Sequence, residues 1–115
     1  GYIDLVFEHG GRFHLADYKS NHLGDNADAY AQPALAAAMR AHRYDLQALI
    51  YAVALHRYLR LRVPDYDFDR HFGGVHYLFL RGMSAAHANG HGVFTLRPDR
   101  ALIERLDRLF QEGAA

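Results

Sequence analysis

The 115-residue chain contains no cysteine, no long apolar run and no excess of either charge. Without cysteine it has neither a disulfide framework nor a thiolate metal site. Since no run of about 18 apolar residues occurs, we expect no membrane-spanning helix and no membrane contact. The formal net charge is zero, which excludes a free-standing basic binder of polyanions. Any contact with nucleic acid must come from locally placed arginines or from regions outside the chain.

Lysine is also scarce. Of the 13 basic residues, 12 are arginine and only Lys19 is lysine. Arginine carries a planar fork that stays protonated, whereas lysine is a compact point donor whose pKa moves readily when it is desolvated. The use of lysine at this one position indicates a need for an ammonium group. Such a group is suited to holding or activating a water beside a metal and a phosphate.

Residues 1–20, which contain this lysine, predict a β-hairpin. The runs 1–7 and 12–20 are rich in aromatic and branched residues, as is typical of strands. Gly10 and Gly11 between them predict a two-residue loop, because both glycines can adopt positive φ. In that register the numbers of paired residues sum to 21.

The predicted register brings two carboxylates together. Asp4 faces Asp17, and Lys19 shares their face because side chains alternate along a strand. Directly opposed like charges are destabilising, so the pair needs a cation between its members or one carboxyl must keep its proton. A hard ion such as Mg²⁺, bound by one or two carboxylates with waters and phosphate oxygens, resolves the repulsion. The alternative is a surface hairpin with an ordinary Asp–Lys ion pair.

The rest of the chain predicts helices and strands in one domain. After a polar loop at 20–26, we expect helices over 28–41, with Pro33 in its first turn, and over 42–62. The next expected elements are a connector at 65–71, a strand over 72–81, a loop at 84–92, a short edge strand over 92–96 and a helix after Pro98. The order of two strands, two helices, two strands and a helix predicts a mixed α/β fold.

Apolar spacing predicts which helix faces are buried. In the helix over 42–62 the expected buried stripe is Leu46, Leu49, Ile50, Val53, Ala54 and Tyr58. In the last helix the residues expected to face inward are Leu102, Leu106, Leu109 and Phe110. The nine histidines show no HExxH or similar spacing, and scattered histidines are typical of surface or hydrogen-bonded positions.

Three short motifs resemble those of the RecB-type branch of the PD-(D/E)xK nucleases: Gly-Tyr-Ile-Asp-Leu-Val at 1–6, Asp-Tyr-Lys-Ser at 17–20 and Gln-Ala-Leu-Ile-Tyr at 47–51. Longer runs resemble the C-terminal nuclease domain of this branch, that of the exodeoxyribonuclease V beta subunit, at 37–47, 54–60, 71–75 and 77–82. The resemblance covers nearly the whole chain. It implies a fragment of a restriction-endonuclease-like fold, a mixed sheet flanked by helices.

The resemblance implies a Mg²⁺-dependent deoxyribonuclease, acting as an exonuclease or endonuclease. Asp4 and Asp17 would bind the metal with the backbone carbonyl of Tyr18. Lys19 would position or polarise the attacking water. These roles agree with the chemistry that the residues themselves indicate.

The resemblance also gives two helix residues a role. Gln47 and Tyr51 are four apart and therefore neighbours on one helix face. They would line the site near the DNA strand. The chain departs from the superfamily pattern because Ile3 stands before Asp4, where a proline gives the superfamily its name.

The resemblance further predicts that residues 1–115 are the C-terminal portion of the nuclease domain of a longer protein. The N-terminal part of that domain, with a metal-binding histidine, and the helicase region would lie before Gly1. We therefore expect the isolated chain to cleave DNA weakly or not at all.

Implied partners are DNA, the RecC and RecD subunits of a helicase-nuclease for double-strand break repair and linear DNA degradation, and the recombinase RecA. The implied location is the cytoplasm. Two alternatives stay open: a non-catalytic docking module for RecA or for the partner subunits, and a metal-dependent phosphoesterase acting on small molecules. The Asp4, Asp17 and Lys19 set argues against a degenerate module.

Overall fold

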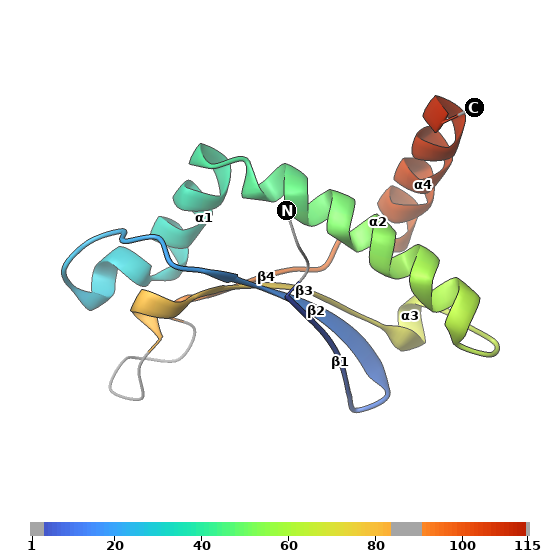
Figure 1. Ribbon diagram of the computed structural model, residues 1–115, viewed down its shortest axis with the longest axis horizontal. Helices are drawn as coiled ribbons and strands as arrows, with labels where there is room; N and C mark the ends of the chain where they lie inside the picture. The colour runs from blue at the N-terminus through green and yellow to red at the C-terminus, as the bar shows by residue number, and fades with distance from the viewer. Residues whose placement is uncertain (1–3, 84–90, 115) are drawn as a thin grey trace.

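The computed structural model describes residues 4–83 and 91–114. It is an α/β fold built on a four-stranded mixed sheet, with α1 and α2 lying along one side of it (Figure 1). The strands are β1 (Leu5–His9), β2 (Arg12–Lys19), β3 (Phe72–Phe79) and β4 (Val93–Leu96). The helices are α1 (Gln32–Ala41), α2 (Tyr44–Arg62), α3 (Phe68–His71) and α4 (Arg100–Ala114), with 3₁₀ turns η1 (Ala27–Tyr30) and η2 (Leu80–Gly82).

The predicted fold class and order of the main elements are confirmed. The short helix α3 forms inside the stretch expected to be a connector, where the Asp67 carboxylate caps it by accepting from the Arg70 amide at 3.1 Å. Pro33 occupies the first turn of α1, as predicted. The expected strand at residues 1–3 and most of the expected loop, residues 84–90, lie outside the described residues.

The hairpin has the predicted register. β1 and β2 are antiparallel, and their pairs run from Leu5 with Ala16 to His9 with Arg12. Gly10 and Gly11 both have positive φ, 60° and 79°, which matches the right-handed twist of the flanking strands. The hairpin loop chemistry therefore set the register over the whole of β1.

The sheet order is β1-β2-β3-β4. β3 runs parallel to β2, and its register places Tyr77 beside Asp17 and Phe79 beside Lys19. β4 is antiparallel to β3 and lies at the edge, as predicted. Because α1 and α2 form the crossover between two parallel strands, they bring helix side chains over the end of β2.

The face of α2 that packs on the sheet is not the predicted one. Ala48, Ala52, Leu55 and Leu59 are buried on it, and Val53, a member of the expected stripe, is also buried. The expected stripe is mostly exposed instead, with relative accessibilities of 54% for Leu46, 47% for Ile50 and 48% for Tyr58. Small side chains at the contact allow the helix to approach the sheet closely, so alanines occupy the inward face although they are less apolar than leucine.

The buried face of α4 also differs from the prediction. Ile103 is fully buried. Leu106, which was expected to face inward, is partly buried and packs against the core. Leu102, Leu109 and Phe110, predicted to face inward, are 38%, 56% and 39% exposed. A charged residue, Asp107, is buried in their place.

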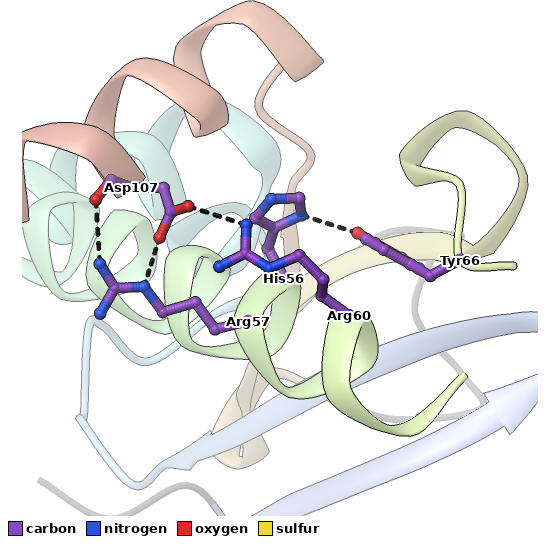
Figure 2. Close-up of polar contacts among 5 residues, drawn as sticks. All are labelled: His56, Arg57, Arg60, Tyr66 and Asp107. Carbon is purple, nitrogen blue, oxygen red and sulfur yellow. Dashed lines mark hydrogen bonds and ion pairs between the residues drawn. The ribbon is translucent and has the colours of Figure 1, made fainter. Parts of the chain in front are cut away.

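Asp107 joins α4 to α2 through two arginines. The Arg57 guanidinium donates to the Asp107 Oδ1 through Nε and to its backbone carbonyl at 2.9 Å, and Arg60 Nη1 donates to Oδ2 at 3.0 Å (Figure 2). Beside them, His56 and the Tyr66 hydroxyl form a 2.8 Å hydrogen bond. Each oxygen of the buried carboxylate is bonded by a different arginine, so the charge is satisfied and this cluster is a structural clamp.

The other face of the sheet carries a stacked group of rings. Phe7 stacks on His14 with centroids 5.1 Å apart, and His14 Nδ1 lies 2.9 Å from His76 Nε2. His76 also bonds the Thr95 hydroxyl at 2.8 Å.

Among the helices of the described part of the chain, none is long and apolar enough to cross a membrane.

Candidate active site on the hairpin

The paired carboxylates of the hairpin meet as the register predicts. Asp4 stands immediately before β1, in line with the Leu5–Ala16 pair, and so faces Asp17. Its Oδ2 accepts a hydrogen bond from the Tyr18 amide at 2.8 Å. This backbone bond, followed by the contact with Asp17, lowers the pKa of Asp4. Asp4 is exposed, so it carries its charge at the mouth of the site.

Asp17 is in a different environment. It is 4% exposed, and burial, followed by the neighbouring Asp4, raises its pKa above the ordinary 3.8. Lys19 Nζ lies 3.2 Å from Asp17 Oδ2, an ion-pair distance. Even so, within the described residues this buried oxygen has no partner in hydrogen-bond geometry. A buried carboxylate oxygen without a donor is costly, and it can accept a further ligand.

Helix α2 adds Gln47 and Tyr51 to the same place. Lys19 Nζ donates to Gln47 Oε1 at 3.4 Å. Tyr51 is 7% exposed, and its pKa is raised by burial and then by the charges of Asp17 and Asp4. The structure therefore brings together five predicted site residues from the hairpin segment and α2: Asp4, Asp17, Lys19, Gln47 and Tyr51.

The sixth predicted residue, Tyr18, makes its described contact through the backbone. Its amide N–H bonds Asp4, while its side chain is 44% exposed on the opposite face of β2. The role predicted for its carbonyl as a metal ligand stays a prediction.

Two residues of the site were missed. Tyr77 in β3 donates its hydroxyl proton to Gln47 Oε1 at 2.6 Å, and the Tyr44 ring lies 4.1 Å from Lys19 Nζ. A signal for Tyr44 existed, because it stands three residues before Gln47 and so on the same helix face. Tyr77 had none, because the register of a parallel pair is set by the crossover and not by a local turn.

The donor set fits a magnesium ion in part. Within residues 4–83 and 91–114, no group of three or more His, Cys, Asp or Glu side chains could hold a metal. Mg²⁺ needs fewer protein ligands, because it keeps several waters and is bound through one or two carboxylates plus substrate phosphates. The Asp4–Asp17 pair, with one buried oxygen that accepts no hydrogen bond, meets that requirement.

No protein-family model matches the chain. Over 110 residues, 96% of its length, it is 58% identical to the RecBCD enzyme subunit RecB of Escherichia coli. The chain is homologous to a segment of RecB. RecB of Haemophilus influenzae is 54% identical over 110 residues, 96% of the chain. RecB of Mycobacterium tuberculosis is 49% identical over 119 residues, 98% of the chain.

The similarity covers only a small part of each RecB. The chain spans 9% of the E. coli and H. influenzae proteins and 11% of the M. tuberculosis protein. The resemblance to RecB predicted from the motifs is confirmed, and the four-stranded mixed sheet is compatible with a PD-(D/E)xK fragment. That this RecB segment is a nuclease domain stays a prediction.

Proposed function

We propose that this chain is the C-terminal portion of a RecB-like nuclease domain and that its hairpin carries a site for Mg²⁺-dependent hydrolysis of DNA phosphodiesters. The parent assembly would be a RecBCD-type helicase-nuclease, with RecC and RecD as partner subunits, acting in DNA repair and recombination. The observation that carries the proposal is the buried Asp17, with an oxygen that accepts no hydrogen bond, between Asp4 and Lys19 in a segment homologous to RecB.

The metal would be held by Asp4 and Asp17, with the Tyr18 carbonyl as a further proposed ligand. When bound, Mg²⁺ supplies Lewis-acid chemistry, lowering the pKa of coordinated water and neutralising charge on the reacting phosphate. It would also offset the burial and the neighbouring Asp4 that together raise the pKa of Asp17. Both carboxylates would then be ionised in the working protein.

The chain's own polar groups suit phosphodiester hydrolysis. The Lys19 ammonium has three donors. One bonds Gln47, and the ammonium lies at ion-pair distance from Asp17, so donor capacity is left for a water or a phosphate oxygen. Gln47 contributes an amide, and Tyr51 contributes a hydroxyl whose raised pKa keeps it protonated as a donor. Positioned donors of this kind stabilise charge that develops on a transferring phosphoryl group.

The decisive test replaces the aligned segment of E. coli RecB with this chain and assembles the chimera with RecC and RecD. Asp17→Ala is expected to lower Mg²⁺-dependent degradation of linear duplex DNA by a factor of about 100 or more, because it removes a metal ligand. Lys19→Arg is expected to lower the rate about 10-fold or more, since a planar fork does not replace a point donor. Acid-soluble nucleotide release measures the rate.

The matched control is Glu8→Gln, which changes an exposed carboxylate of β1 on the same strand face as Asp4. It should leave degradation unchanged, and unwinding by the complex should survive in every variant. If Asp17→Ala and Lys19→Arg both degrade DNA at the rate of the unsubstituted chimera, the site assignment is wrong.

A second candidate role, the docking module, has one observation in its favour. A groove of about 400 Å³ between the β1–β2 hairpin and α2 is lined by Val6, Leu15, Ala54, Leu55 and Tyr58. Large apolar side chains continue along the exposed side of α2, where Leu61 is 84% exposed. Exposed apolar surface of this kind typically marks a protein contact. Under this candidate, Ile50→Ser with Leu61→Ser would weaken retention of RecA or of RecC and RecD and leave degradation rates per assembled complex unchanged.

A further inference from the structure

The ammonium of Lys19 is enclosed by side chains from α2, β3 and its own strand β2, a group that we call the cage. Tyr44 presents its ring face at 4.1 Å, and the Tyr77 ring lies at 5.4 Å. Gln47 Oε1 accepts from the ammonium at 3.4 Å, and the Asp17 carboxylate is 3.2 Å away. A cation over an aromatic face is attracted by the ring quadrupole, most strongly when it is partly desolvated. The lysine side chain is 16% exposed, so this attraction is only partly screened.

The same surroundings determine the orientation of the Gln47 side-chain amide. The lysine ammonium has donors and no acceptor, so the amide atom that faces it must be the oxygen. Tyr77, which is fully buried, donates its hydroxyl to that same oxygen at 2.6 Å. With Oε1 held by two donors, the NH₂ group of Gln47 turns away from them and is available as a donor.

Tyr44 is itself anchored. Its hydroxyl donates to Asn21 Oδ1 at 3.3 Å, and its ring stacks on His42 at 5.2 Å. It is the first residue of α2, directly after Arg43, whose φ of 60° turns the chain between α1 and α2. The ring is therefore fixed by its backbone and by the loop after β2, independently of the lysine.

We propose that Tyr44 and Tyr77 are positioning residues: Tyr44 holds the Lys19 ammonium beside Asp17, and Tyr77 orients the Gln47 amide so that its NH₂ group donates to a phosphate oxygen of the DNA strand. The inference rests on the proposed nuclease function for its catalytic consequence. The positions of Tyr44 and Tyr77 around Lys19 and Gln47 do not depend on that function, so the positioning and the nuclease activity can be tested separately.

The first test needs neither metal nor DNA. Because the chain has one lysine, the Cε–Hε correlation of Lys19 is a single identifiable signal in a ¹³C-labelled sample. Tyr44→Leu should move this signal toward that of a solvent-exposed lysine, because the ring current is lost. Tyr44→Phe should leave it in place, because the ring face is kept. An unchanged Lys19 signal in a folded Tyr44→Leu chain would overturn the proposal.

The second test measures degradation by the RecB chimera at varied DNA concentration. Tyr44→Leu should lower the rate at saturating DNA about 10-fold, with Tyr44→Phe within about twofold of the parent. Tyr77→Phe should mainly raise the DNA concentration needed for half the maximal rate, about threefold, because the amide is no longer oriented. Parent-like kinetics for both Tyr44→Leu and Tyr77→Phe would overturn the proposal.

Phe110→Leu is the control, since this partly exposed ring lies on α4, away from the cage. It should change neither the lysine signal nor the kinetics. A chimera that never degrades DNA would contradict the proposed function, whereas the lysine signal would still decide whether the tyrosines position Lys19.

Discussion

Asp17 and Asp107 are buried to nearly the same degree, 4% and 5% exposed, and both pack against α2. Near the start of the helix, Asp17 has one lysine beside it and an oxygen without a hydrogen-bond donor. Near its end, both carboxylate oxygens of Asp107 are bonded by Arg57 and Arg60 (Figure 2). Asp17 and Asp107 are therefore almost equally buried, and they differ in the residues that bind their carboxylate oxygens.

The difference in partners reverses the direction in which the pKa is shifted. Burial, followed by Asp4, raises the pKa of Asp17. Burial acts in the same direction on Asp107, but the hydrogen bonds and charges of Arg57 and Arg60 outweigh it and lower the pKa. A carboxylate that arginine forks satisfy completely contributes to packing, whereas one left incompletely satisfied can take a ligand. The distinction separates a structural ion pair from a candidate site.

The largest expected effect on stability is at the satisfied carboxylate. Asp107→Asn should lower the free energy of unfolding of the chain by about 2–3 kcal/mol, because two arginines lose their anionic partner. The value is at the low end for buried pairs, since the arginine side chains are 36% and 46% exposed. Urea unfolding measures it. Asp69→Asn, in an exposed ion pair with Arg100, should change stability by less than about 0.5 kcal/mol.

The same substitution at the other carboxylate should have the opposite sign. Asp17→Asn should raise the free energy of unfolding of the metal-free chain by about 1 kcal/mol, because it removes a desolvated charge that faces Asp4. Mg²⁺ should stabilise the parent chain and the Asp107→Asn chain, but not Asp17→Asn, by mass action. A loss of stability in Asp17→Asn as large as that in Asp107→Asn would remove the contrast between the two carboxylates.

The pH dependence of stability should separate the two carboxylates by sign. Asp107 has a folded pKa below 3.8, so its contribution is present above that pH and is lost as pH falls through the folded value. Asp17 has a folded pKa above 3.8, so its penalty is absent in acid and grows as pH rises through the folded value. Unfolding curves from pH 3 to 7 for the parent, Asp17→Asn and Asp107→Asn chains, without Mg²⁺, measure both. Parallel curves would contradict this assignment.

The smallest expected effect comes from changing a donor without changing its charge. Arg60→Lys should cost about 0.5 kcal/mol of stability, because Arg57 keeps two bonds to Asp107 and a lysine can still reach one oxygen. Arg57→Lys should cost more, since Arg57 binds both the carboxylate and the backbone carbonyl. Thermal unfolding of the two variants ranks them, and the reverse order would contradict the assigned geometry.

The hairpin shows how much of the site can be predicted from the local sequence. The Gly10-Gly11 loop sets the register, and the register places Asp4 opposite Asp17 on the face of Lys19. The partner helix was predicted through the resemblance, and Gln47 and Tyr51 do lie at the site. Short-range geometry and specific motifs were sufficient for these residues.

The helix faces show where such prediction fails. Apolar residues surround α2 on all sides, from Leu46 to Leu61, so three- and four-residue spacing fits more than one face. Burial was decided by how closely the helix could approach the sheet, which favoured Ala48 and Ala52. In α4 the pattern gave no reason to expect a buried aspartate, because the arginines that satisfy Asp107 lie 47 and 50 residues away in sequence.

By itself, the sequence determined the hairpin, its facing carboxylates and the solitary lysine, because turn chemistry and side-chain alternation act over a few residues. Only the tertiary structure decided which carboxylate is satisfied, which face of α2 is buried, and that Tyr44 and Tyr77 enclose Lys19 and Gln47. Those outcomes depend on contacts between elements far apart in the chain, where packing distance and the parallel register of β2 and β3 override local patterns.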